Sequence, residues 1–177
     1  MAVLEQIDRL GSVIEQVRTD LGNAPEPPIA TFSASTSLVD DYRTSVQIRD
    51  FTFEVDEPPQ IGGTDTGPTP VELVLAALGT CQEIVYATYA RTLGIPIDGV
   101  DVTAEGRLDL RGFFGVADVP AGFQDVTYTV DIASSAPAAD IARLVEAVNA
   151  HCPVLDILQQ PVTVHGAFRL NGETIEA

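Results

Sequence analysis

The feature that most constrains the fold of this 177-residue chain is a glycine- and proline-rich loop that leads directly into a long apolar segment. The loop ends at Pro70, and the apolar run extends from Val71 to about Leu93 with Cys81 near its middle. Proline suits the first turn of a helix, because its missing N–H removes no helical hydrogen bond. The run is apolar on nearly every face up to Cys81, which predicts a helix that is buried on all sides.

The net charge of −17 narrows the classes of possible partner. The chain has 26 acidic residues against nine arginines, and it has no lysine. Nucleic acids and anionic membranes bind positively charged surfaces, so we expect neither as a partner. Polar and small residues at 79–83 interrupt the apolar run, so we do not expect it to span a membrane. The N-terminus shows no apolar signal-peptide core, and we therefore expect a cytoplasmic protein.

Hydrophobic periodicity divides the chain into two parts. Apolar residues recur every three or four positions over residues 3–21, which is typical of an amphipathic helix. A linker rich in proline and glycine follows at 22–28. We therefore expect an N-terminal amphipathic helix at 1–24 and one domain at 25–177. The helix is expected to pack on the body or on a partner subunit, and a regulatory arm is the alternative.

The second part alternates short strands with helices. Strands are expected at 29–37, 45–48, 51–55, 100–110, 126–132 and 162–170, and helices at 71–93, 136–150 and 154–158. This order is typical of an α+β fold with helices on one side of a sheet. Residues 111–123 are expected to form a loop whose three phenylalanines pack at the edge of the core or line an apolar pocket.

The residues available for chemistry are few. The sequence has no C-x-x-C pair and no cysteine–histidine spacing typical of zinc, so we expect no metal and no cofactor. A serine hydrolase is not supported either, because there is no G-x-S-x-G motif and there are only two histidines to act as a base.

Thiol chemistry remains, and it depends on the surroundings of the two cysteines. Only a thiolate is nucleophilic, so a reactive cysteine needs an electropositive neighbourhood. Cys152 precedes a proline and an expected helical turn, where the helix dipole favours negative charge. For Cys81, Arg43 and Arg91 are possible but distant cations. An inert, buried Cys81 is the alternative, since free cysteines are among the most buried residues.

Two separated motifs resemble the OsmC/Ohr superfamily of osmotically induced and organic hydroperoxide resistance proteins. The first is G-G-T-D-x-G-P-T-P-x-E-L-x-L-A-A-L-G-x-C at Gly62–Cys81, and the second is H-C-P-V at His151–Val154. The V-D-E-P-P stretch at Val55–Pro59 also fits. The resemblance covers about residues 30–170. It implies an OsmC-like α+β fold, in which an antiparallel sheet wraps around two central helices of an intertwined homodimer.

The resemblance also implies a function, the thiol-dependent reduction of organic hydroperoxides in defence against oxidative stress. Carried over to this chain, Cys81 attacks the hydroperoxide and becomes a sulfenic acid, and Cys152 resolves it to a disulfide. Arg43 matches the strand arginine that lowers the pKa of the first thiol and orients the peroxide. A dithiol such as a lipoylated protein is the implied reductant.

One departure concerns the glutamate that holds this arginine in the peroxidase branches of the family. It directly follows the loop proline there, whereas this chain has Val71 at that position and Glu72 one later. The nine residues from Glu72 to Cys81 turn an ideal helix by about 900°, which points the two side chains apart. Glu72 is thus either a site residue or a first-turn carboxylate that suits the helix dipole. An OsmC-like dimer that binds an apolar small molecule, without peroxidase activity, is the alternative function.

Overall fold

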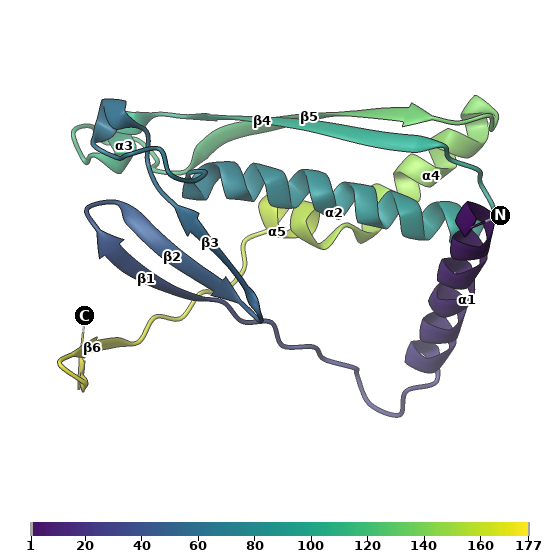
Figure 1. Cartoon of the computed structure of the whole chain (residues 1–177), viewed down its shortest axis with the longest axis horizontal. Coiled ribbons are helices and arrows are strands. Elements are labelled where there is room, and N and C mark those ends of the chain that lie inside the picture. Colours follow the sequence, from purple (N-terminus) through teal and green to yellow (C-terminus); the bar gives the residue numbers. More distant parts are fainter. Residues whose placement is uncertain (1, 177) are drawn as a thin grey trace.

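One long helix, α2, forms the axis of the fold in the computed structural model, which describes residues 2–176 and the side chains from residue 9 onward. The strand pair β4–β5 covers one side of α2, and α4 and α5 pack against another (Figure 1). The helices are α1 (Ala2–Gly22), the 3-10 turn η1 (Pro59–Ile61), α2 (Pro70–Leu93), α3 (Leu110–Phe113), α4 (Ala138–His151) and α5 (Pro153–Gln159). The strands are β1 (Ser35–Asp40), β2 (Arg43–Ile48), β3 (Phe51–Val55), β4 (Gly99–Leu108), β5 (Phe123–Ala133), β6 (Phe168–Leu170) and β7 (Glu173–Ile175).

The strands form three antiparallel sheets, with the orders β1-β2-β3, β4-β5 and β6-β7. The β4–β5 pair is the longest, and it runs from Gly99 opposite Ala133 to Leu108 opposite Phe123. Its inward positions alternate along each strand, as the sequence predicts for a sheet with one face on a core. The α+β class is therefore confirmed.

Local sequence signals fix both ends of α2. The Thr69 side chain accepts the backbone N–H of Glu72, and the Glu72 carboxylate accepts the backbone N–H of Thr69 at 2.7 Å. This capping box satisfies two N–H groups that a helix start leaves without partners. At the other end, Gly94 adopts a left-handed conformation with φ 66°, which ends the helix at little steric cost.

The hydrophobic core lies between the buried face of α2, the β4–β5 pair and the helices α4 and α5. It contains Leu78, Val85, Tyr86, Ala90, Ile95, Leu144, Val148, Cys152 and Leu155. Residues 78, 82, 86 and 90 follow one another every four positions, so they share one face of α2. Burial of this face is what holds the helix in place, because apolar area removed from water is the main source of stability.

A buried carboxylate organises the loop that precedes α2. One oxygen of Asp56 accepts the backbone N–H and the hydroxyl of both Thr64 and Thr66, and the other accepts the N–H of Glu57 at 2.8 Å. The loop passes so close to β3 that a Cβ at Gly63 would lie 1.7 Å from the Glu57 carbonyl oxygen. This position therefore requires glycine.

The structure corrects the expectation that α2 is buried on all sides. Only one face is covered in the single chain, and Ile84 on the opposite face is 66% exposed. The β4–β5 pair lies along one side of α2 and α4 and α5 along another (Figure 1), and apart from α1 near the C-terminal end of α2 the described part of the chain supplies no layer for the face that carries Ile84. By length and composition, α2 is also the one described helix that could cross a membrane, a test that core helices pass as well.

The expected C-terminal strand at 162–170 is wrong over most of its length. Only Phe168–Leu170 forms a strand, which pairs with Glu173–Ile175 in a small hairpin. Residues 162–167 have no ladder, because an apolar alternation forms a strand only where a partner accepts its hydrogen bonds. Similarly, the first strand begins at Ser35 rather than residue 29, and the expected loop at 111–123 opens with the short helix α3.

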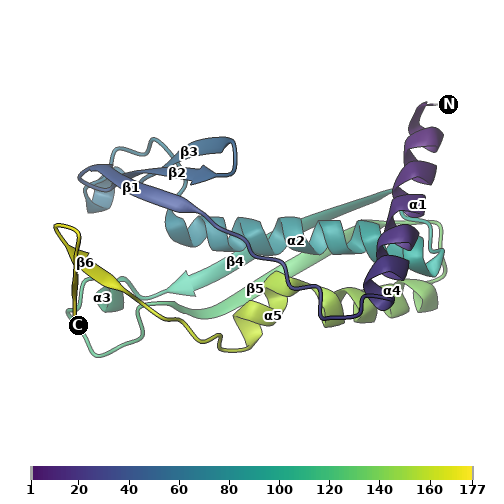
Figure 2. The same cartoon turned by 90° about the horizontal axis from the view of Figure 1, so that it is seen from below.

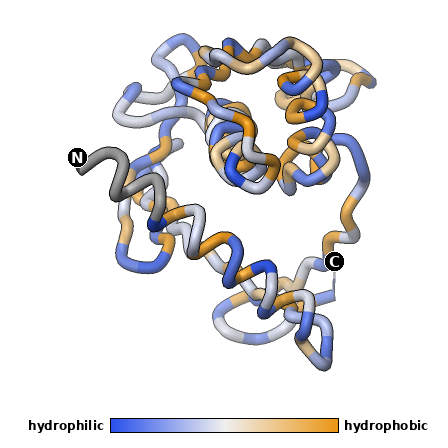
Figure 3. The backbone as a smooth tube through the Cα atoms, turned by 90° about the vertical axis from the view of Figure 1, so that its right-hand side faces the viewer, coloured by the Kyte–Doolittle hydropathy of each residue, from blue (hydrophilic) through white to orange (hydrophobic). Residues whose placement is uncertain are grey.

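Several segments stand away from the core. The β1–β3 sheet and the β6–β7 hairpin project beyond one end of α2, while α1 crosses the other end (Figure 2). Hydrophobic and hydrophilic residues alternate along the coloured part of α1 (Figure 3). These segments carry many of the exposed large apolar side chains, including Val17, Leu38, Phe51, Phe168 and Leu170.

We predict that Asp56→Asn lowers the melting temperature by several degrees at pH 7 and by a smaller amount at pH 3. The hydroxyl of Thr64 and the neighbouring N–H groups hold the pKa of Asp56 far below its usual range. A carboxyl with a depressed pKa stabilises the fold above its unfolded-state pKa, about 3.9, and this contribution fades as the pH falls below that value. Thermal unfolding at both pH values, with Asp65→Asn as the control in the same loop, measures the effect. An equal loss at both pH values would contradict it.

Candidate functional site

The two cysteines, 71 positions apart in sequence, meet at the centre of the molecule. The Cys152 thiol donates a hydrogen bond to the Cys81 sulfur, and the two sulfurs are 3.4 Å apart. Both are free thiols. Cys152 is only 1% exposed, whereas Cys81 is half-buried, so Cys81 is the one that a soluble reagent reaches first.

The spacing of α4 explains how Cys152 reaches this position. Leu144, Val148 and Cys152 follow one another every four residues, so they lie on one side of the helix and face the core. Cys152 ends α4 and is the N-cap residue of α5, which begins with Pro153. The expectation that Cys152 precedes a helical turn is therefore confirmed.

The first turn of α5 faces Cys81 as well. Burial raises the pKa of the Cys81 thiol, and the backbone N–H of Val154 partly offsets this by donating to the sulfur. The neighbouring Cys152 raises the pKa further. These groups alone therefore keep Cys81 protonated at neutral pH, and a thiolate there requires an additional positive charge.

The structure does not bring Arg43 to Cys81 within the single chain. Arg43 lies on β2 and forms ion pairs with Asp40 at 2.6 Å and Glu54 at 3.6 Å. Arg91, the other candidate cation, lies in the last turn of α2, where one guanidinium nitrogen donates to the Ala87 carbonyl.

Glu72 closes the capping box of α2, so its position already has a structural explanation. Its charge also contributes, after burial and the charge of Asp56, to the raised pKa of Glu57. The role of Glu72 near Cys81 stays a prediction.

His151 lies at the end of α4 and stacks on Tyr89 with 4.8 Å between the ring centroids. Its Nδ1 is 2.8 Å from the Ala147 carbonyl oxygen. His151 therefore occupies a helix-end position. Among the described residues, no group of three or more histidine, cysteine or acidic side chains is arranged to hold a metal ion.

A cavity of about 380 Å³ lies between α2, β5 and α5, and neither cysteine is among the residues that line it. Its lining residues are Leu78, Phe123, Asp125, Val126, Tyr128, Leu155, Leu158 and Gln159. The Tyr128 hydroxyl donates to Asn149, and burial and then Cys152 raise the pKa of this tyrosine. Of the three loop phenylalanines, Phe123 lines this cavity, while Phe113 and Phe114 contact each other edge to face.

Gln82 is a polar residue that the sequence reasoning did not single out. It is fully buried on the core-facing side of α2, and neither its amide nitrogen nor its carbonyl oxygen has a hydrogen-bond partner among the described residues. A glutamine at the centre of an apolar face was the signal that could have drawn attention to it. A buried amide without partners is costly, so the core is not built for stability alone next to Cys81.

The family model described as OsmC-like protein matches residues 63–165, a segment that contains both cysteines. The chain belongs to the OsmC-like family. No curated protein matches its sequence.

Solved structures of OsmC-like proteins share the fold. An OsmC-like protein from Mycoplasma pneumoniae superposes with a TM-score of 0.64 at 18% identity, over 75% of this chain and 89% of that chain. An organic hydroperoxide resistance protein OsmC from Legionella pneumophila gives 0.59 at 20% identity, over 74% and 90%. An organic hydroperoxide resistance protein from Elizabethkingia anophelis, solved with bound thiocyanate, gives 0.57 at 19% identity, over 77% and 93%. At this identity the likeness concerns the fold.

We predict that Gln82→Met increases the free energy of unfolding by about 1–3 kcal/mol, because it replaces a buried amide without partners by an apolar side chain of similar length. Urea unfolding of the reduced protein measures this, with the exposed Gln47→Met as the control. A lower stability of Gln82→Met would contradict the account, since it would mean that the amide forms a stabilising hydrogen bond.

Proposed function

We propose that this OsmC-like protein is a thiol-dependent peroxidase that reduces organic hydroperoxides. The observation that carries the proposal is the 3.4 Å separation of the Cys81 and Cys152 sulfurs. A partly exposed thiol in contact with a buried second thiol is the arrangement that a peroxidatic and a resolving cysteine need. We place the reaction in the cytoplasm, where a reducing environment keeps such thiols available.

In the first step the Cys81 thiolate attacks one peroxide oxygen. A sulfur–oxygen bond forms, the oxygen–oxygen bond breaks, and the leaving alkoxide takes up a proton to become an alcohol. The sulfur is oxidised by two electrons to a sulfenic acid, and the peroxide is reduced by the same two electrons. The Val154 N–H, which already donates to the Cys81 sulfur, stabilises the negative charge of the attacking thiolate.

In the second step the Cys152 sulfur attacks the Cys81 sulfur. A disulfide forms, the sulfur–oxygen bond breaks, and the proton of the Cys152 thiol leaves with the hydroxide as water. The Cys152 thiol supplies the proton that the leaving hydroxide takes up, so the step balances without an outside acid. A dithiol such as that of a lipoylated protein then returns both cysteines to thiols by exchange.

We assign the remaining positive charge to Arg43, supplied within a homodimer. The exposed face of α2, together with the apolar side chains of β1–β3 and β6–β7, leaves an apolar surface that a second copy of the chain can cover. Arg43 lies on one of these projecting strands, so the arginine beside a given Cys81 can come from the partner subunit. Glu72 remains the candidate carboxylate that orients Arg43.

We infer the substrate class from the cavity between α2, β5 and α5, whose lining residues Leu78 and Leu155 are each three positions from a cysteine in sequence. Phe123, Leu155 and Leu158 give it apolar walls, which suit the organic group of a hydroperoxide rather than hydrogen peroxide.

We expect the reduced protein to consume cumene hydroperoxide and Cys81→Ser to show only the uncatalysed background rate. Cys152→Ser should consume one equivalent in its first turnover and then stop, because its sulfenic acid cannot be resolved. Peroxide consumption and trapping of the sulfenic acid with dimedone measure both effects, and Thr80→Ser is the control on the same helix. Parental activity in Cys81→Ser would end the proposal.

We further expect Arg43→Gln to shift the pH dependence of the reaction with peroxide to higher pH. Burial raises the pKa of the Cys81 thiol, so without the guanidinium the thiolate forms only above the ordinary cysteine value of about 8.5. The rate constant at saturating reductant should then rise about tenfold per pH unit below that value. Arg49→Gln on the same sheet is the control. An unchanged profile would exclude Arg43 as the cation.

The second candidate function is an OsmC-like dimer that binds an apolar small molecule without peroxidase activity. The observation in its favour is that the cavity exists while the described chain offers Cys81 no neighbouring cation. Free thiols that survive excess hydroperoxide would favour this function over the peroxidase.

A further inference from the structure

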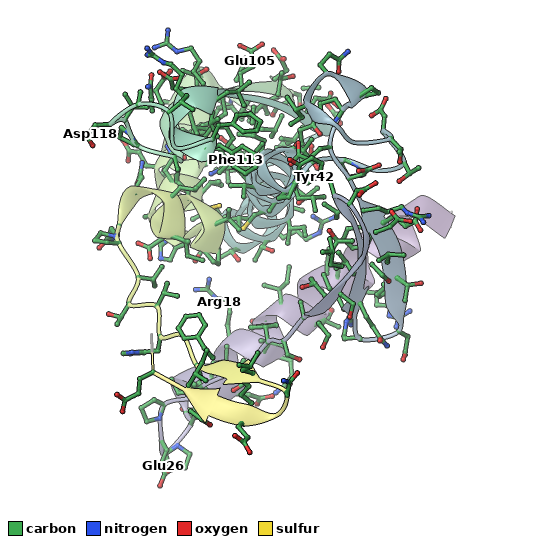
Figure 4. The ribbon with its side chains drawn as sticks, turned by 90° about the vertical axis from the view of Figure 1, so that its left-hand side faces the viewer. Arg18, Glu26, Tyr42, Glu105, Phe113 and Asp118 are labelled. Carbon is green, nitrogen blue, oxygen red and sulfur yellow. The ribbon has the colours of Figure 1, made fainter. Side chains whose placement is uncertain are left out.

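Two arginines meet in a cleft on the opposite side of the molecule from the β1–β3 sheet. Helix α1 lies across the C-terminal end of α2 (Figures 1 and 2). A cleft of about 300 Å³ is lined by residues of both helices. Its lining residues are Gly11, Ile14, Glu15, Arg18, Arg91 and Thr92. In Figure 4 the side chain of Arg18 leaves α1 and extends toward the helices of the body.

Both arginines have unused hydrogen-bonding capacity. Within the part of the chain that the structure describes, neither Arg18 nor Arg91 forms an ion pair, whereas Arg43, Arg107 and Arg111 each pair with a carboxylate. The Nε of Arg91 is buried and has no acceptor among the described residues. The parts of both guanidinium groups that line the cleft are therefore free to take an acceptor from solvent.

The charge of the cleft contrasts with that of the whole chain. The protein has a net charge of −17, yet the two arginines outweigh the one carboxylate in the cleft, that of Glu15. Position in the last turn of α2 explains why a cation is favourable at Arg91, but it does not explain a second arginine facing the same space from another helix. Guanidinium groups bind the oxygens of phosphate and carboxylate groups through paired N–H donors.

We propose that the cleft between α1 and α2 binds a small anion through Arg18 and Arg91, with phosphate or carboxylate oxygens as the acceptors. The anion bridges the two helices and so holds α1 against the body. The site is separate from the thiol pair, and this proposal does not depend on the peroxidase proposal.

Calorimetric titration of the full-length protein with inorganic phosphate, at constant ionic strength set with chloride, tests the site. Saturable binding of one phosphate per chain is expected. Arg18→Gln and Arg91→Gln should each weaken it by about 10- to 100-fold, as expected for the loss of a hydrogen bond to a charged group. Arg9→Gln removes the same charge from α1 outside the cleft and is the control. Succinate in place of phosphate tells whether the site also accepts carboxylates.

A variant that removes a negative charge from the cleft separates specific binding there from the effect of the net charge of the protein. Glu15→Gln removes the competing carboxylate and should tighten phosphate binding, and amide hydrogen exchange in α1 should slow when phosphate is bound. Absence of saturable binding by both anions would overturn the proposal. Binding that is equally strong in Arg18→Gln and Arg91→Gln would overturn it as well, since the ion would then be adventitious.

Discussion

The structure depends on the packing of one face of α2 against α4 and the β4–β5 pair. Leu78 and Tyr86 on α2 and Leu144 and Val148 on α4 are almost completely buried in this contact. The same contact fixes the relative position of Cys81 and Cys152, because each cysteine lies on one of the two helices or at its end. Stability and thiol geometry therefore have one physical origin, and a change in the packing of these helices changes the sulfur–sulfur distance.

The surroundings of the thiol pair contain groups whose burial lowers the stability of the core. Burial raises the pKa of Cys81, which opposes formation of the thiolate. One residue further along α2, Gln82 is buried and has no hydrogen-bond partner among the described residues. Polar groups in a core are costly, and such costs concentrate at functional sites. The loop before α2 shows the opposite arrangement, since the buried carboxylate of Asp56 is satisfied by five donors.

Local rules explain which parts of the fold the sequence could predict. The expected helix at 71–93 is observed as Pro70–Leu93, because a proline, a capping box and a C-terminal glycine act within a few residues of one another. The strand expected at 162–170 failed because pairing is not a local property. The proximity of Cys81 and Cys152 was likewise beyond any spacing rule, and only the family resemblance implied it.

The site was predictable to a similarly uneven degree. The two cysteines were the obvious candidates because the chain has no others. The ion pairs of Arg43 and the capping role of Glu72 needed coordinates, since both depend on which side chains meet in space.

Trapping the disulfide tests the central claim most directly. The reduced protein is treated with one equivalent of cumene hydroperoxide, digested without reductant and analysed by mass spectrometry. The account predicts one intramolecular cross-link between the peptides of Cys81 and Cys152, with one equivalent of cumyl alcohol and the loss of both thiols together. Two free thiols alongside unconsumed hydroperoxide would contradict it.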